Sequence, residues 1–130
     1  MAFALAVACS VALGTTSPAL AGGGPPIPRI YDCYGFATIV PTYVSALQLK
    51  SKSVYLVAPI RQGNHLSGRA ARGTYKLRGG KVTFRTGPYA RIHWYGKWVL
   101  RRSYAGSSTD QAHISLFNPQ HQEVLECYPH

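Results

Sequence analysis

Apolar and polar residues alternate along most of the chain, and segment 73–88 shows this most clearly. Apolar side chains occupy every second position on both sides of a Gly79-Gly80 pair, which is the period of a strand with one buried face. Two adjacent glycines supply the positive φ angles that a tight hairpin turn needs. The segment therefore predicts a β-hairpin. Its apolar face carries Tyr75, Leu77, Val82 and Phe84, and its other face carries the cations Lys76, Arg78, Lys81 and Arg85.

Other short segments also have the composition of strands, and no stretch of ten or more residues keeps the 3.6-residue apolar period of a helix. Pro41 should end the first strand, because proline cannot donate to a strand ladder. Pro59 and a turn at 62–64 should end the third, and a turn at 118–120 makes the last two strands a hairpin. The polar composition of residues 103–111 predicts an exposed loop. The additional predicted strands are 30–40, 44–49, 54–58, 91–101, 112–117 and 123–128.

Seven or eight short strands within about 100 residues predict an all-β fold, arranged as an antiparallel meander. We expect a small closed or partly open barrel, with a β-sandwich as the alternative, because both can place the terminal strands side by side. Residues 30–130 are long enough for one core and form a single domain. Residues 22–29, rich in glycine and proline, are expected to be a flexible leader.

Residues 1–21 have the features of a secretion signal. No charged residue occurs from Ala2 to Ala21, an apolar run fills much of this segment, and Ala19 and Ala21 form the small-residue pattern that a signal peptidase reads. A membrane anchor is the alternative, but the apolar run is short and is interrupted by glycine, threonine and serine. We therefore expect cleavage after Ala21 and a secreted protein without a transmembrane segment.

Two cysteines, Cys33 and Cys127, remain near the ends of the domain once Cys9 leaves with the signal. An even number of cysteines in an oxidising compartment predicts a disulfide. The loop it closes is nearly the whole domain, which the chain-entropy model values at about 4–5 kcal/mol. Such a bond would join the first strand to the last, as a closed barrel requires.

Charge is the strongest indication of function. The chain has 14 Lys and Arg against 4 Asp and Glu, a formal net charge of +10, and most of the cations lie between Arg61 and Arg102. A basic field of this kind attracts polyanions by steering and by counterion release. For a secreted protein the candidates are teichoic acid, acidic polysaccharide, anionic lipid surfaces and extracellular nucleic acid. The competing interpretation is that lysine and arginine only protect exposed strands from edge pairing.

Strand 91–101 contributes aromatic residues to this basic region. Alternation places Trp94 and Trp98 with the aliphatic residues of the core, and Tyr95 on the cationic face. Aromatic rings beside cations can stack on bases or sugars. The predicted anion-binding residues are Lys76, Arg78, Lys81, Arg85, Arg91, Tyr95, Lys97 and Arg101.

Motifs for catalysis or metal binding are weak in this sequence. The five histidines form no H-E-x-x-H motif, and the serines have no G-x-S-x-G context. In size and disulfide placement the chain resembles the small guanyl-specific extracellular ribonucleases, whose chemistry needs a carboxylate base, a histidine acid and arginines at the phosphate. Only Glu123 and Glu126 could supply that base, both in the last predicted strand, and the N-terminal helix of that family has no counterpart. No catalytic residue and no metal site is therefore predicted.

A second resemblance covers most of the domain. The segment Gly73-Thr74-Tyr75, followed by Val82-Thr83-Phe84 and Gly87-Pro88 and bracketed by Cys33 and Cys127, is similar to small secreted bacterial single-domain β proteins of uncharacterised function. The resemblance implies an all-β fold and brings no catalytic residue or cofactor.

The sequence favours a monomeric, non-enzymatic secreted domain that binds an anionic envelope or extracellular polymer. The alternative is a lipocalin-like barrel that holds a small apolar ligand. A secreted ribonuclease or an enzyme inhibitor is the less favoured interpretation.

Overall fold

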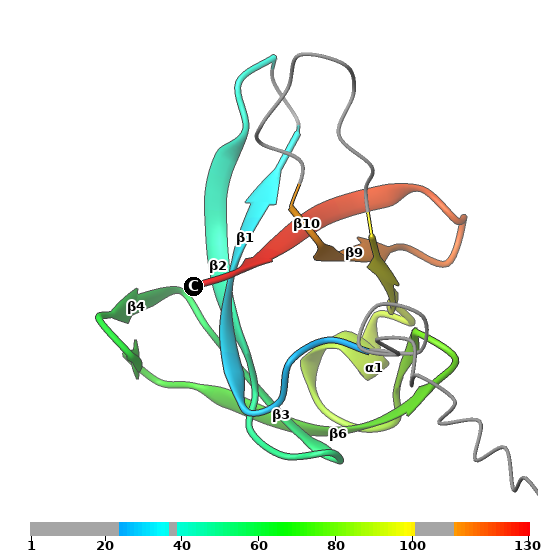
Figure 1. The fold of residues 1–130 in the computed structure, drawn as a ribbon, viewed down its shortest axis with the longest axis horizontal. Helices are drawn as coiled ribbons and strands as arrows, with labels where there is room; N and C mark the ends of the chain where they lie inside the picture. Colours follow the sequence, from blue (N-terminus) through cyan, green and yellow to red (C-terminus); the bar gives the residue numbers. More distant parts are fainter. Residues whose placement is uncertain (1–23, 37–38, 101–110) are drawn as a thin grey trace, which may run out of the picture.

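The computed structural model describes residues 24–36, 39–100 and 111–130. Strands dominate these residues, together with one helix of a single turn, α1 (Pro88–Arg91) (Figure 1). The predicted signal lies outside the described residues. The strands in chain order are β1 (Arg29–Gly35), β2 (Thr42–Leu49), β3 (Val54–Ala58), β4 (Ile60–Gln62), β5 (His65–Ser67), β6 (Ala71–Arg78), β7 (Lys81–Phe84), β8 (Tyr95–Val99), β9 (His113–Phe117) and β10 (Glu123–Pro129).

Eight of these strands form a closed antiparallel barrel in the order β1-β10-β9-β8-β7-β6-β3-β2. Each strand pairs with its neighbour in the chain, except that the β4–β5 hairpin is left out between β3 and β6. The first strand pairs with the last, so the barrel has no open sheet edge. The predicted all-β barrel is confirmed in its closed form.

The disulfide closes the barrel as predicted. Cys33 lies directly opposite Cys127 in the β1–β10 ladder, and the two are bonded across 94 residues of sequence. Both side chains are fully buried and belong to the core inside the barrel. The backbone N–H of His130 donates to the carbonyl of Ile30, at 2.9 Å, and extends the same pairing to the end of the chain.

Alternation along the strands separates the core from the outer surface. Hairpin β6–β7 turns at Gly79-Gly80, both with positive φ, and directs Tyr75, Val82 and Phe84 inward as predicted. Inward residues of the other strands, together with Tyr89 of α1, complete a core with several tyrosines. Its members are Tyr31, Cys33, Leu47, Leu49, Tyr55, Tyr75, Val82, Phe84, Tyr89, Ile114, Leu116, Leu125 and Cys127.

The predicted strand 91–101 is wrong in its first half. Pro88 opens helix α1, which includes Arg91, and the strand begins only at Tyr95. Gly87 precedes the helix with a φ of 88°, and a Cβ there would lie 2.6 Å from Gly73 Cα, so the corner requires glycine at this position. Trp94 follows the helix and still packs against the core, stacked on Tyr89 at 5.4 Å between ring centroids.

The predicted strand 30–40 is also shorter than expected. The first strand ends at Gly35, which pairs with Thr42 at the start of β2. In the leader, Ile27 packs against the core, and the Tyr31 hydroxyl donates to the carbonyl of Pro26 at 2.6 Å. No helix in the described part of the chain has the length and apolar character needed to cross a membrane.

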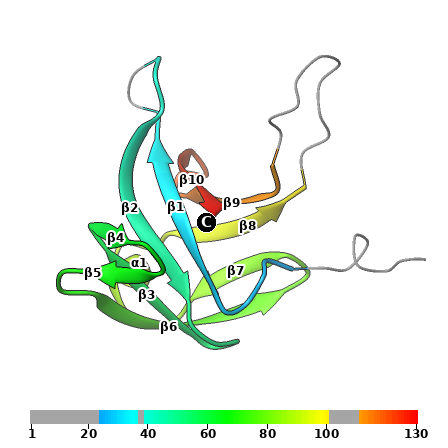
Figure 2. The same ribbon diagram turned by 60° about the vertical axis from the view of Figure 1, so that its left-hand side comes forward.

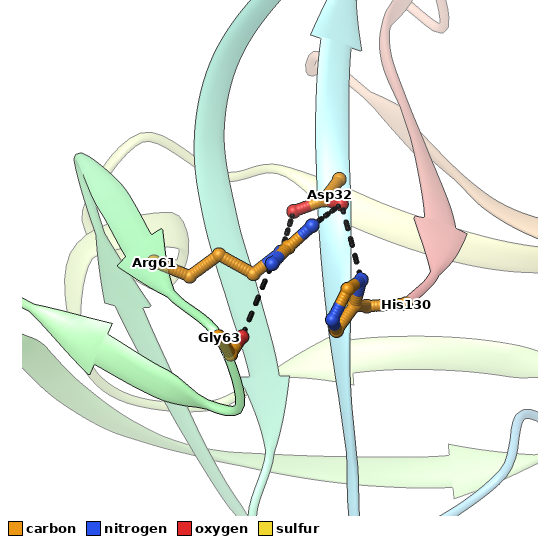
Figure 3. Close-up of polar contacts among 4 residues, drawn as sticks. All are labelled: Asp32, Arg61, Gly63 and His130. Atoms are coloured by element: carbon orange, nitrogen blue, oxygen red, sulfur yellow. Dashed lines mark hydrogen bonds and ion pairs between the residues drawn. The ribbon is translucent and has the colours of Figure 1, made fainter.

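Hairpin β4–β5 was not predicted, because three-residue strands carry too little pattern to recognise. It forms a separate two-stranded sheet outside the barrel, beside β2 and β3 (Figure 2). Arg61 holds it there through two hydrogen bonds to Asp32 on β1, Nε to Oδ1 at 2.6 Å and Nη2 to Oδ2 at 2.9 Å (Figure 3). Its Nη1 also donates to the carbonyl of Gly63, at 3.1 Å, which ties the turn of the hairpin to the same guanidinium.

Candidate functional site

Three cations lie in one row across the outer face of β6, β7 and β8. Arg78 is the register partner of Lys81, and Lys81 is the register partner of Lys97. All three are exposed. Adjacent strands are about 4.8 Å apart, and like charges directly opposite one another destabilise a sheet. The row therefore concentrates positive charge on this face at some cost to the stability of the sheet.

Two aromatic rings lie beside this row and position its lysines. Tyr95 on β8 stacks on Phe117 on β9, with ring centroids 5.2 Å apart and planes 14° apart. The Nζ of Lys81 lies 5.4 Å from the centroid of Tyr95, and the Nζ of Lys97 lies 5.4 Å from that of Phe117. Cation–π attraction at exposed sites is worth about 0.5–1 kcal/mol, enough to favour these two ammonium positions.

An open cleft of about 670 Å³ lies next to the stacked rings. Lysine, aromatic and imidazole side chains line it, and among the described residues of its lining there is no carboxylate. The Tyr95 hydroxyl hydrogen-bonds to His121 Nδ1 at 2.8 Å, which connects the β8 strand to the β9–β10 turn. The lining residues that are polar or aromatic are Lys81, Thr83, Phe84, His93, Trp94, Tyr95, Lys97 and His121.

The predicted anion-binding residues are only partly brought together. Lys81, Tyr95 and Lys97 line the cleft. Lys76 and Arg85 are exposed, with Lys76 the register partner of Thr83 on the cleft side of β7. Of the remaining three, Arg78 is the register partner of Lys81, Arg91 is exposed on α1, and Arg101 lies outside the described residues.

His93 and His121 line the cleft but were not among the predicted binding residues. Both have positive φ angles, 57° and 65°, which non-glycine residues adopt uncommonly. Each lies in a turn, one after α1 and one between β9 and β10. His93 and His121 are 28 positions apart, and no sequence motif links residues at that separation. They line the same cleft only because both turns fold toward β8.

A second polar cluster lies on the outer face of β9 and β10. His113 is fully buried, and its Nδ1 hydrogen-bonds to the carbonyl of Gln111 at 3.0 Å. Its Nε2 lies 3.0 Å from Ser115 Oγ, which in turn lies 3.5 Å from a Glu123 oxygen. Glu126, 6 % exposed, accepts a hydrogen bond from the hydroxyl of Tyr128. The potential ligand atoms of His113, Glu123 and Glu126 all lie within 4.8 Å of one another, a grouping that no motif in the sequence indicated.

A third site surrounds the ion pair between Asp32 and Arg61. The side chains of Tyr34, Tyr43 and Ile60 complete a shallow pocket of about 210 Å³ around it. His130 Nδ1 lies 3.9 Å from Asp32 Oδ2 on the other side of the carboxylate (Figure 3). Because Asp32 is already engaged by Arg61 in a bidentate pair, this site serves mainly to attach the β4–β5 hairpin.

Comparisons with known proteins give no relative for this chain: no family model matches it, and no curated protein and no solved structure gives a significant match. Three sites among the described residues thus remain as functional candidates. Of these, the cationic cleft combines an open concave surface with a clustered charge, and its lysines, imidazoles and aromatic rings are suited to holding an anionic ligand.

Proposed function

We propose that this protein is a non-enzymatic secreted domain that binds an anionic polymer through the cleft on the outer face of β7 and β8. The observation that carries the proposal is the row Arg78–Lys81–Lys97. Facing cations on adjacent strands repel one another, and a bound anion would relieve that repulsion. The net charge of +10 would add long-range attraction for the same partner.

The arrangement of the rings bears on which polymer is bound. Because Lys81 lies over Tyr95 and Lys97 lies over Phe117, the rings hold ammonium groups instead of presenting bare faces to nucleobases. Lysine ammonium groups recognise phosphate, sulfate or carboxylate groups as point charges. This favours teichoic acid or an acidic polysaccharide over single-stranded nucleic acid.

The alternative, a small apolar ligand inside the barrel, has less support. Large side chains occupy the interior, among them Tyr31 and Tyr55, which are fully buried. Tyr55 and Tyr89 stack inside the barrel at 5.7 Å with planes 4° apart. A ligand would have to displace these packed rings, and the hydrogen bond from the Tyr55 hydroxyl to the Thr86 carbonyl would break as well.

Secretion belongs to the same proposal. The buried Cys33–Cys127 bond is consistent with an oxidising compartment, where disulfides persist. The apolar segment 1–21 with its Ala19–Ala21 cleavage pattern would direct the chain there. Envelope teichoic acids and acidic polysaccharides are polymers that a protein of this compartment meets.

The test compares binding to purified teichoic acid and to heparin over a range of salt concentrations. The double variant Lys81→Gln/Lys97→Gln should weaken binding and lower the slope of log K against log salt by about one unit for each lysine that no longer neutralises an anionic group of the polymer. The matched control is Lys50→Gln/Lys52→Gln, which removes the same charge from exposed lysines in the β2–β3 turn, away from the cleft lining.

Equal weakening in the two double variants would mean that binding depends on net charge alone, and would overturn the cleft as the site. Tighter binding to single-stranded nucleic acid than to either polymer would overturn the choice of partner. Each variant should retain the secondary structure of the wild type, because all four lysines are exposed.

A further inference from the structure

We propose that His113, Glu123 and Glu126 bind a divalent transition-metal ion, Zn²⁺ in particular, on the outer face of β9 and β10. The proposal is independent of polymer binding, since none of the three residues lines the cationic cleft. The proposal rests on the clustering of an imidazole and two carboxylates from two neighbouring strands. One ligand comes from β9 and two come from β10.

An irregularity in β10 is what places both glutamates on the same face. Residues three apart in a regular strand point to opposite faces, because side chains alternate with a period of two. The pairing of β10 with β9 shifts between Glu123 and Leu125, as at a β-bulge. Glu123 consequently pairs with Phe117 and Glu126 with Ser115, two positions that both face outward, while Leu125 remains in the core.

The imidazole of His113 is already oriented as a ligand. A backbone carbonyl can only accept, so Nδ1–H of His113 donates to Gln111, which leaves Nε2 as the ring atom that could bind a metal ion. Metal-bound histidines characteristically donate their second N–H to a carbonyl or carboxylate in this way, which fixes the tautomer and the ring plane. An ion bound to Nε2 would replace the hydrogen bond between Nε2 and Ser115 Oγ, which are 3.0 Å apart.

Distances and ligand type select the metal. The ligand atoms lie within 4.8 Å of one another, and Zn–N and Zn–O bonds of about 2.0–2.2 Å would draw them together by roughly 1 Å. The hydrogen bond from Tyr128 to Glu126 is compatible with ligation, because a carboxylate has about four lone-pair positions. An imidazole with two carboxylates suits zinc, whereas magnesium and calcium prefer all-oxygen sites with more ligands.

The test is calorimetric titration of the purified protein with ZnCl₂, with MgCl₂ and CaCl₂ titrated in parallel. We expect one zinc ion per chain and no comparable binding of magnesium or calcium. Glu123→Gln should bind zinc at least about tenfold more weakly, since even residues that only support a metal ligand contribute 10–100-fold to affinity. Glu123 is exposed, so this variant should fold normally.

His65→Gln is the matched control, because His65 is an exposed histidine on β5 that lines no described cleft. It should bind zinc as the wild type does. Co²⁺ provides a second readout, because its visible absorption changes when nitrogen and carboxylate ligands replace water, and the change should be absent in Glu126→Gln. Absence of zinc binding by the wild type, or zinc affinity in Glu123→Gln equal to that of the wild type, would overturn the proposal.

Discussion

Lys81 and Lys97 lie directly opposite each other on β7 and β8, and each places its ammonium group 5.4 Å from the centre of a different ring of one aromatic stack. Lys81 lies over Tyr95, and Lys97 lies over Phe117. The negative faces of the rings offset part of the repulsion between the two lysines. The two lysines are thus exposed and closely spaced, an arrangement suited to an anionic ligand.

If the rings orient these lysines, removing a ring should weaken polymer binding even though every charge is kept. We expect Tyr95→Leu to bind heparin or teichoic acid about two- to fivefold more weakly, the equivalent of one exposed cation–π interaction. Tyr95→Phe is the control, because it keeps the ring and removes only the hydroxyl that bonds to His121. Equal weakening in both variants would assign the effect to the hydroxyl. Affinity can be measured by calorimetry at fixed salt.

The disulfide should contribute a large share of the stability. Replacing Cys33 and Cys127 with alanine releases a closure of 94 residues and should lower the free energy of unfolding by about 2–5 kcal/mol. The destabilisation arises mainly because the unfolded chain gains conformational freedom, with an added cost for the space left in the core. Urea denaturation of the oxidised wild type and the double variant measures it. A difference in the free energy of unfolding below about 1 kcal/mol would contradict a stabilising role for this covalent closure.

Gly73 on β6 should not tolerate a side chain. A Cβ there would lie 2.3 Å from the Thr86 carbonyl oxygen and 2.4 Å from the ring of Tyr55, which is itself fixed between Thr86 and Tyr89 by hydrogen bonds. Gly73→Ala should therefore destabilise the protein by about 1–3 kcal/mol or more, as overpacking of a core does. The measurement is the midpoint of urea denaturation.

Gly79→Ala is the comparison for that variant. Gly79 has a φ of 56° and nothing within 4 Å of an added Cβ, so only the left-handed backbone is penalised, by about 1 kcal/mol. A destabilisation at Gly79 as large as that at Gly73 would indicate that backbone conformation, and not the contact with Tyr55, is what requires glycine in this hairpin.

Alkaline pH should unfold the protein through its buried tyrosines. Burial raises the pKa of Tyr89 to about 12, and burial also raises the pKa values of Tyr31, Tyr55 and Tyr75. The folded state therefore holds these protons more tightly than the unfolded state, where tyrosine has a pKa near about 10. Stability is fully present below about pH 10 and should fall as the pH rises from about 10 to 12.

Circular dichroism together with tyrosinate absorbance follows this transition. Tyr89→Phe removes one of the ionising groups and should move the alkaline midpoint to higher pH. Titration of all tyrosines near about pH 10 with the fold intact would contradict the assignment of these rings to the core.

Much of the fold could be predicted because strands and hairpin turns are specified by residues close together in the sequence. The alternation around Gly79-Gly80 predicts the β6–β7 hairpin and the face of every residue in it, since a period of two is unambiguous over four positions on each side. Helix α1 could not be predicted, because four residues are too few to show a helical period. The β4–β5 hairpin was missed for the same reason, and its position depends on the distant partner of Arg61, Asp32.

The all-β class, the alternation of inner and outer positions, the pairing of Cys33 with Cys127 and the basic middle of the chain could all be inferred from the sequence alone. These follow from backbone periodicity, turn chemistry and charge, which act between near neighbours or depend on composition. Three contacts emerge only from the folded barrel: Lys81 lies opposite Lys97, His121 bonds to Tyr95, and His113 lies close to Glu123 and Glu126. These contacts depend on the strand register and on one irregularity in β10, because a shift of one residue would turn each side chain to the opposite face of the sheet.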